Sequence, residues 1–298
     1  MKILISCNNL SWLGGGEIYN YELAKELSKR HTVTIVSHSN VDWEFPLVKE
    51  LLNNNVRIFN FNEAPIEDFD YIIMNQHTQK QPIKCLDKYK SGFVVTIIHS
   101  ELDAVKSKNV VLPKPYCDRI SKYITIRPKI CDMLKENYNL SDDQVCMWYN
   151  GFDFSRFNTD YVKKQNEKEI GLYVGPVQQQ IRNQSFRHLV DNCDVDNQEI
   201  WVVSGISFPA ANNVKWLPMK WDVEKYIKQC NFTAGIWLGR TTIEGLLCGV
   251  PGYVYDVDME GNVLDVDLVY PDDYDLDDFN IVNLAKKYER LYEDNYDN

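Results

Sequence analysis

The chain has 298 residues, of which 44% are hydrophobic and 12% aromatic, so it is too apolar for disorder and long enough for two domains. Its net charge of −11 arises in residues 256–298, which hold 14 Asp or Glu against 3 Lys or Arg; residues 1–255 are balanced. This predicts a solvated acidic surface near the carboxyl end, and overall acidity disfavours a general nucleic-acid binder.

Cysteine usage and the hydrophobic segments predict a cytoplasmic protein. The eight cysteines are scattered, without a C-x-x-C pair or a histidine at metal-ligand spacing, which favours reduced thiols. Residues 1–9 (MKILISCNN) indicate a first strand rather than a signal peptide, and no window reaches the roughly 20 apolar residues of a transmembrane helix.

Residues 80–135 form a basic block, with 12 Lys or Arg against 5 Asp or Glu. The block is either an ordinary Lys-rich surface or a contact for an anionic partner. Such a partner would be phospholipid at the inner membrane face, which would make the protein peripheral, a lipid diphosphate or nucleic acid.

The first half of the chain alternates short apolar runs with amphipathic stretches, a pattern typical of a parallel sheet covered on both faces. It predicts an N-terminal Rossmann-like domain over residues 1–150. We expect its strands at 2–7, 32–37, 56–61, 71–75, 93–99 and 123–126, and its helices at 17–30, 43–55 and 128–138.

After a polar, aperiodic linker at 158–168 the same alternation starts again and predicts a C-terminal Rossmann-like domain over 151–278. The last segment, 279–298, holds a helix at 279–293 that we expect to pack back across the domain junction. The fold class is therefore α/β, with two Rossmann-like parallel-sheet domains facing across a cleft. Strands of the second domain are expected at 169–175, 199–205, 213–217, 232–238 and 252–257, and helices at 183–192, 222–230 and 241–248.

Three glycines, Gly14, Gly15 and Gly16, lie between the first strand and the first helix. They let the backbone approach a ligand at a helix N-terminus, so the loop and Glu17 are candidate ligand contacts; a flexible turn is the alternative. The loop is not G-x-G-x-x-G and no acid ends the second strand, which disfavours a dinucleotide.

Two histidines follow strands of the first domain, His99 directly after FVVTII and His77 after YIIMNQ. At the mouth of a cleft, a histidine can hydrogen-bond a sugar hydroxyl or shuttle a proton. A purely structural role is the alternative for both.

In the second domain, Arg182 follows the loop that begins at Gly175 and enters a helix. Its guanidinium can clamp a phosphate bidentately, unless it is an ordinary surface arginine. Pairs of the D-x-D type at 194–196, 256–258 and 265–267 are expected by chance in so acidic a chain, so we predict no metal site.

The stretch GRTTIEGLLCGVP, 239–251, carries Glu244 one turn inside a predicted helix. One interpretation is a capping box, in which Thr241 caps the helix and Glu244 returns to its amide. The other is a ligand site, in which the free N–H groups of the helix start bind phosphate and the carboxylate holds the two hydroxyls of a ribose. The phosphate contacts would come from Gly239, Arg240, Thr241 and Thr242.

Together these motifs resemble the retaining GT-B glycosyltransferases, especially glycosyltransferase family four. GGGEIYNYELAKEL resembles that family's glycine loop and first helix, VTIIHSE its strand-end histidine, and NGFDFSRF the signature that enters the second domain. LYVG resembles the start of the second domain, and GRTTIEGLLCGVPGYVYD the helix whose glutamate binds the nucleotide ribose.

The resemblance implies a nucleotide-diphosphate sugar, UDP- or GDP-linked, bound mainly by the second domain, and an acceptor glycan or lipid-linked sugar bound by the first. Glu244 would hold the ribose, and Arg182 would replace the usual diphosphate-binding lysine. His99 and the glycine loop would surround the sugar, with Glu17 and His77 as further sugar or acceptor contacts. Transfer would retain configuration and need neither a cofactor nor a metal.

Three positions differ from the family pattern: Pro176 replaces an arginine, Ile236 a glutamate and Ser100 an aspartate. They motivate the alternative of an inactive relative that binds a nucleotide or a partner protein. A further alternative within transferases is sugar addition to modified bases in DNA, with the basic block of 80–135 on the phosphates.

Overall fold

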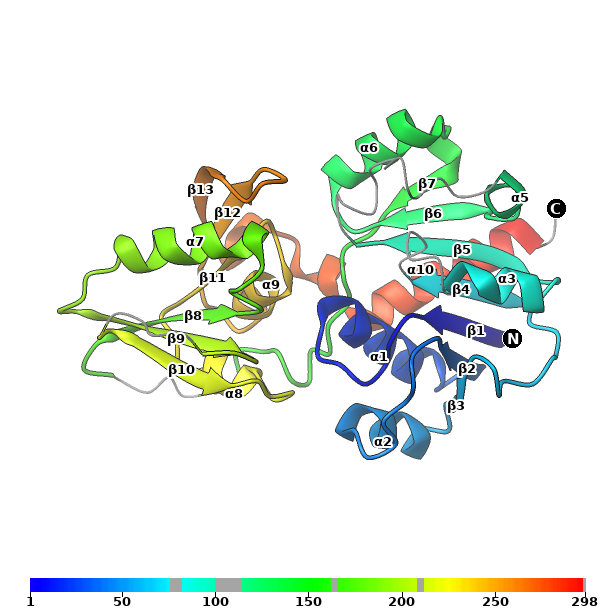
Figure 1. Cartoon of the computed structure of the whole chain (residues 1–298), viewed down its shortest axis with the longest axis horizontal. Helices are drawn as coiled ribbons and strands as arrows, with labels where there is room; N and C mark the ends of the chain where they lie inside the picture. Colours follow the sequence, from blue (N-terminus) through cyan, green and yellow to red (C-terminus); the bar gives the residue numbers. More distant parts are fainter. Residues whose placement is uncertain (76–81, 100–113, 162–165, 208–211, 297–298) are drawn as a thin grey trace. The chain divides into compact units, whose positions relative to one another are not determined.

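The computed structural model describes residues 1–75, 82–99, 114–161, 166–207 and 212–296. It divides into two compact units, the first made of Met1–Gly151 with Asp278–Asn298, and the second of Phe152–Asp277. Each unit has a sheet with helices packed on it (Figure 1). The carboxyl-terminal helix therefore belongs to the same unit as the amino-terminal sheet.

Unit 1 is built on a seven-stranded sheet in the order β3-β2-β1-β4-β5-β6-β7, with every neighbouring pair parallel. The strands are nearly continuous apolar runs because helices cover both faces of such a sheet. The strand order reverses between β1 and β4. The strands are β1 (Lys2–Cys7), β2 (Thr32–Ser37), β3 (Arg57–Asn60), β4 (Tyr71–Asn75), β5 (Phe93–Ile98), β6 (Lys122–Thr125) and β7 (Val145–Met147).

Helices of unit 1 form where apolar residues recur at helical spacing. In α1, Tyr19, Leu23 and Leu27 are buried four residues apart, and the helix starts two residues before the expected position because Gly14 is its N-cap. The helical segments before residue 151 are α1 (Gly15–Leu27), α2 (Pro46–Asn53), η1 (Pro82–Lys84), α3 (Cys85–Lys88), α5 (Lys114–Cys117), α6 (Pro128–Tyr138) and η2 (Asp142–Gln144).

Unit 2 has the same winding in a six-stranded sheet, β10-β9-β8-β11-β12-β13, whose order reverses between β8 and β11. The strands from β8 to β12 pair in parallel, as their apolar runs predict. Its strands and helices are β8 (Glu169–Val174), α7 (Gln180–Asp191), β9 (Gln198–Ser204), β10 (Val214–Pro218), α8 (Glu224–Ile227), β11 (Phe232–Ile236), α9 (Arg240–Leu247), β12 (Gly252–Val257) and β13 (Val263–Val269), followed by η3 (Pro271–Asp273) and η4 (Leu276–Phe279).

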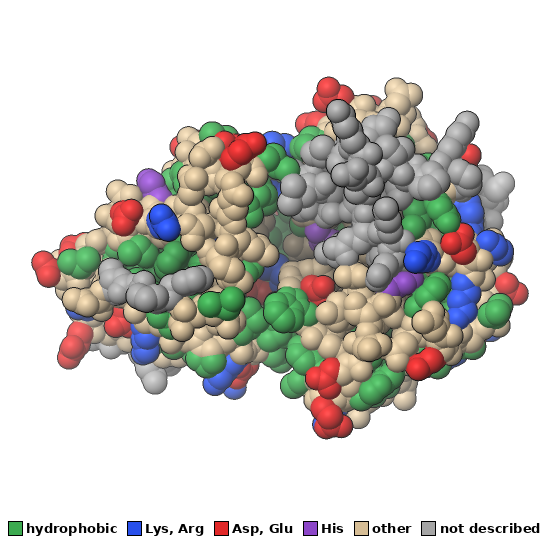
Figure 2. Space-filling model, viewed as in Figure 1, with side chains coloured by type: hydrophobic (Ala, Val, Ile, Leu, Met, Phe, Trp, Pro, Cys, Tyr) green, Lys and Arg blue, Asp and Glu red, His purple; other side chains and the backbone are tan. Residues whose placement is uncertain are grey.

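The acidic carboxyl-terminal segment contains a strand that the sequence interpretation missed. β13 pairs antiparallel with β12 at the edge of the sheet, where Asp265 lies opposite Asp256. Its acidic side chains are exposed. On the face shown in Figure 2, Asp and Glu side chains lie at the surface of both units, interspersed with Lys and Arg.

The final helix, α10 (Ile281–Tyr296), packs on α1 and β5 within unit 1. A buried stripe at helical spacing makes this contact, since Leu284 and Tyr288 are almost fully buried. The Tyr288 hydroxyl lies 2.7 Å from the hydroxyl of Tyr19 on α1. Tertiary packing of this apolar stripe thus fixes the end of the chain against the first helix.

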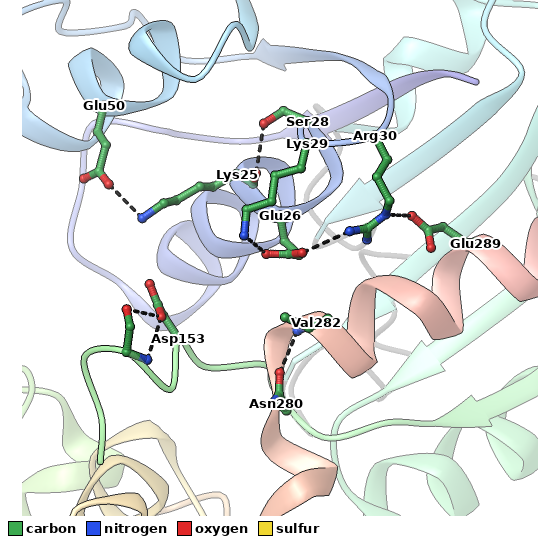
Figure 3. Close-up of polar contacts among 11 residues, drawn as sticks. Lys25, Glu26, Ser28, Lys29, Arg30, Glu50, Asp153, Asn280, Val282 and Glu289 are labelled. Atoms are coloured by element: carbon green, nitrogen blue, oxygen red, sulfur yellow. Dashed lines mark hydrogen bonds and ion pairs between the residues drawn. The ribbon is translucent and has the colours of Figure 1, made fainter. Parts of the chain in front are cut away.

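Ion pairs border the same helix contact. Arg30, just after α1, donates from Nε to Oε1 of Glu289 on α10 at 2.7 Å and from Nη1 to Oε1 of Glu26 at 3.2 Å. Figure 3 shows both carboxylates directed at this one guanidinium. The pair with Glu26 is local, four residues apart, whereas the pair with Glu289 connects segments far apart in sequence, which the carboxyl-terminal acidity alone does not predict.

All eight cysteines are free thiols. Across the described ranges, no helix combines the length and the apolarity needed to cross a membrane.

Candidate functional site

In unit 2 the strand order reverses between β8 and β11, and the loops that leave these neighbouring parallel strands lie at one edge of the sheet. Open α/β sheets bind ligands at such reversal points, outside the carboxyl ends of the strands. Both loops contain left-handed backbone, at Gly175 (φ 142°) and at Trp237 (φ 51°). This conformation is unfavourable for a bulky residue such as tryptophan, and such strain clusters at functional sites.

Arg182 lies against the loop after β8. A Cβ placed on Gly175 would be 3.1 Å from Nη1 of Arg182, so the absence of a side chain at Gly175 leaves room for the guanidinium. Arg182 lies in the first turn of α7 and is half-buried. This burial argues against the alternative that it is an ordinary exposed surface arginine. A guanidinium beside the N-terminus of a helix is an arrangement that suits an anion.

The helix that carries Glu244 is α9, and its N-cap is Gly239, with no side-chain cap. Thr241 and Thr242 are buried inside the helix. The capping-box interpretation of Thr241 and Glu244 is therefore wrong, because the N-cap lies two residues before Thr241 and the helix already starts at Arg240. The first N–H groups of α9 are left without a side-chain acceptor, as an anion site requires.

Glu244 forms a buried ion pair with Arg240, one turn earlier on the same helix. Its Oε1 accepts hydrogen bonds from Nη2 at 3.0 Å and from Nε at 3.2 Å, and the two side chains are only 6% and 12% exposed. Burial raises the pKa of the Glu244 carboxyl, and the neighbouring guanidinium groups of Arg240 and Arg156 oppose this rise. The Arg240 guanidinium also lies 4.3 Å above the centre of the Phe152 ring.

A second ion pair, which the sequence interpretation missed, belongs to the same cluster. Arg156 donates from Nη2 to Oε2 of Glu224 at 2.7 Å, and its guanidinium lies 3.9 Å from the centre of the Trp221 ring. Both Arg156 and Glu224 contribute to the electrostatic environment of Glu244. The only sequence signal was that Arg156 lies in NGFDFSRF.

At the N-terminus of α1 in unit 1, a carboxylate folds back over the glycine loop. A Cβ on Gly14 would lie 2.3 Å from Oε2 of Glu17, so a side chain at that position would displace the Glu17 carboxylate from this place. Burial raises the pKa of Glu17, although a hydrogen bond to its own backbone N–H opposes the rise. Because a carboxylate already occupies this helix start, the loop suits a hydroxyl-bearing ligand better than a phosphate.

Asn75 fixes this loop to the sheet, a role that the sequence interpretation missed. It ends β4, the strand next to β1, and its Nδ2 donates to the carbonyl of Gly16 at 3.0 Å and to Oδ1 of Asn20 at 2.7 Å. The sequence did contain a signal for this role, because Asn75 is a polar residue at the end of the apolar run YIIMN.

His99 directly follows β5 and is half-buried. Its ring meets the ring of Tyr19 edge-on, with the ring centres 5.0 Å apart, and the Tyr19 hydroxyl bonds that of Tyr288. The carboxyl-terminal helix thus supports the side chain against which the histidine packs. His77, Ser100 and residues 80–81 and 100–113 of the basic block lie outside the described residues.

No known family profile and no curated protein matches the sequence, but solved structures match the fold. A glycosyltransferase from Rickettsia africae is similar with a TM-score of 0.67 at 13% identity, covering 98% of this chain and 98% of that one. HepE from Anabaena in complex with UDP-glucose gives a TM-score of 0.65 at 15% identity, covering 85% and 80%. An α-glucosyltransferase in complex with UDP and a 13-mer DNA gives 0.58 at 13% identity, covering 86% and 79%.

The chain has the GT-B fold of these glycosyltransferases. This confirms the predicted pair of Rossmann-like domains, each a mainly parallel sheet with helices. At identities this low, the similarity is one of fold, and chemistry has to be argued from the residues of each site.

The D-x-D pairs have local partners in the structure. Asp258 accepts hydrogen bonds from the backbone N–H groups of Glu260 and Asn262 and from the Asn262 side chain, so it shapes a turn after β12. Within the part of the chain that the structure describes, no group of three or more His, Cys, Asp or Glu side chains could hold a metal ion. The absence of a metal requirement stays a prediction.

Proposed function

We propose that this protein is a glycosyltransferase of the EC 2.4 class, which moves a sugar from a nucleotide-diphosphate sugar to an acceptor hydroxyl. The observation that carries the proposal is the reversal point of unit 2, where Arg182 and an α9 without a side-chain cap share one edge of the sheet. Structures with the same fold contain UDP or UDP-glucose, which favours a UDP-linked donor here.

In this proposal the diphosphate binds Arg182 and the first N–H groups of α9, where both the side chain and the helix dipole favour negative charge. A phosphate also attracts Arg240 away from Glu244. The released carboxylate then accepts hydrogen bonds from the two adjacent hydroxyls of the ribose. Glu244 would thus exchange its hydrogen bonds to Arg240 for hydrogen bonds to the ribose. It would not remain unpaired in the complex, because an unpaired buried carboxylate is strongly destabilising.

Transfer in this proposal retains configuration. The acceptor oxygen attacks the anomeric carbon from the face that the diphosphate leaves, the carbon–oxygen bond to the phosphate breaks, and the acceptor proton passes to a diphosphate oxygen. Arg182 and the helix start stabilise the leaving charge, so no metal is required. His99, Glu17 and the loop of Gly15 and Gly16 contact the transferred sugar and the acceptor, a glycan or a lipid-linked sugar.

Calorimetric titration with UDP and with uridine tests the proposal. Arg182→Gln should weaken UDP binding about tenfold or more and leave uridine binding unchanged, because a charged hydrogen bond is worth about 1.5–3 kcal/mol. Glu244→Gln should weaken both ligands, since both contain the ribose. UDP-glucose hydrolysis in the absence of an acceptor then shows whether the bound donor is reactive.

A matched variant separates binding from folding. Arg187 is an exposed arginine further along α7. Arg187→Gln should leave UDP affinity within about twofold of the wild type. Equal losses of UDP and uridine in Arg182→Gln, or full UDP affinity in Glu244→Gln, would contradict the assigned roles.

The inactive-relative alternative makes a different prediction in the same assay. A protein that only binds a nucleotide would bind UDP but would not hydrolyse UDP-glucose or any other nucleotide sugar of a panel. Pro176 and Ile236, which depart from the family pattern, motivate this alternative.

A further inference from the structure

A polar cavity lies in unit 1 at the carboxyl ends of β2 and β3, separate from the glycine loop. Its volume is about 210 Å³, and Ser37, His38, Asn60, Phe61, Asn62 and Lys84 are among its lining residues. A second hollow of about 390 Å³ shares Phe61, Asn62 and Lys84 with it. The donor site and the sugar contacts proposed above do not include the residues of this cavity.

The walls of the cavity are fixed by hydrogen bonds. Asn60 accepts from the backbone N–H of Val41 at 3.0 Å and donates to Glu63 at 2.8 Å. The His38 ring stacks on Phe61 with the ring centres 4.3 Å apart, and its Nε2 lies 3.1 Å from Oγ of Ser6. A cavity held in this way needs little ordering when a ligand enters.

Amides and hydroxyls give the cavity a chemistry that suits a sugar, and Lys84 adds a positive charge. The Lys84 side chain is exposed, and no described carboxylate forms an ion pair with it. The neighbouring Lys88 differs, because its ammonium donates to the backbone carbonyls of Phe61 and Ala64. Lys84 therefore remains available for an anionic group of a ligand.

Hydrogen bonds join the loop after β2 to the loop that leads into Gly14. The N–H of Ser39 donates to the carbonyl of Asn8, and the N–H of Asp42 to Oγ of Ser11, both at 2.7 Å. The residues after Ser11 and Asp42 are tryptophans, Trp12 and Trp43, which are 58% and 43% exposed. Exposed indole rings can pack on the C–H faces of sugar rings, so the surface beside the glycine loop is suited to carbohydrate.

We propose that the cavity at the ends of β2 and β3 is an acceptor subsite that binds a carbohydrate bearing a phosphate or carboxylate group. The role of this carbohydrate as the acceptor rests on the proposed function, whereas its binding in the cavity does not. Asn40 and Asn62 would contact sugar hydroxyls, and Lys84 would pair with the anionic group.

Titrations of the full chain with glucose 6-phosphate, glucuronate and glucose test this subsite. We expect both anionic sugars, or the one whose anion reaches Lys84, to bind about tenfold more tightly than glucose. Lys84→Gln should abolish that difference, and Asn62→Ala should weaken all sugars that bind. Lys90→Gln, at an exposed lysine outside the lining, should change nothing.

Unchanged affinity in Lys84→Gln, or no saturable binding of either anionic sugar, would overturn the subsite. UDP titration of the same samples separates this outcome from failure of the proposed function. If UDP binds and the anionic sugars do not, the subsite fails alone. If the anionic sugars bind in a Lys84-dependent way and UDP does not bind, the subsite stands and the transferase proposal fails.

Discussion

Arg240 and Glu244 form a buried ion pair within a single helix, α9. Both side chains are almost fully buried, and neither charge is tolerable there without the other. Their spacing of four residues places them on the same face of α9. The pair therefore has a structural role in the free protein and, in our proposal, a binding role in the complex.

This coupling predicts the stability of single and double variants. Arg240→Met leaves a buried carboxylate without its partner and should lower the free energy of unfolding by about 3 kcal/mol. Arg240→Met combined with Glu244→Met replaces the pair with apolar side chains of similar size and should recover most of that loss. Urea denaturation followed by tryptophan fluorescence measures the free energy of unfolding of each variant. If the double variant lost as much stability as Arg240→Met and Glu244→Met added together, the two charges would not be coupled.

The sequence predicted where the candidate site residues lie in the fold better than it predicted which side chains they contact. It placed Arg182, Gly239 and Glu244 after strands of one domain, and the structure has them there. It did not reveal that Arg240 holds Glu244, because the same letters also fit a capping box and only burial separates the two. The left-handed backbone of Trp237 has no signal in local sequence at all, since tryptophan disfavours that conformation.

Among the elements, parallel strands were predictable and the edge strand was not. Buried strands such as β1 and β4 are nearly unbroken apolar runs. In the sequence of β13, apolar residues alternate with exposed aspartates, so the segment resembles a solvated tail. The apolar stripe of α10 predicted a helix with one buried face. A stripe does not specify its partner, however, and the contact with α1 depends on three-dimensional packing.

Contact between α1 and α10 leads to a prediction about the Tyr19–Tyr288 hydrogen bond. Tyr288→Phe leaves the buried Tyr19 hydroxyl without its partner and should lower the free energy of unfolding by about 1–2 kcal/mol. Tyr71 is the matched control, because its buried hydroxyl has no partner among the described residues and its ring belongs to the same cluster. Tyr71→Phe should change stability by no more than about 0.5 kcal/mol in calorimetric melting, and equal losses in both variants would contradict the role of the bond.

For the whole molecule, the described part of the basic block is less available to an anionic partner than its composition suggested. Arg119 donates to the carbonyls of Leu86 and Tyr89, and Lys122 to that of Asp143. Lys135 pairs with Asp142. These groups are engaged with the protein itself, while the net charge of the chain is −11.

This charge distribution predicts weak binding to DNA. A labelled 20-base-pair duplex, followed by fluorescence anisotropy at about 0.15 M salt, should bind with a Kd weaker than about 10⁻⁴ M, the weak limit of ordinary non-specific binding. The affinity should also depend little on salt, because few lysines and arginines in the described part of the basic block are free to displace counterions from the phosphates. Micromolar binding that falls steeply as salt rises would instead favour the DNA-modifying alternative. The same titration with Lys84→Gln would then show whether the lysine proposed to bind anionic sugars also contacts phosphates of the duplex.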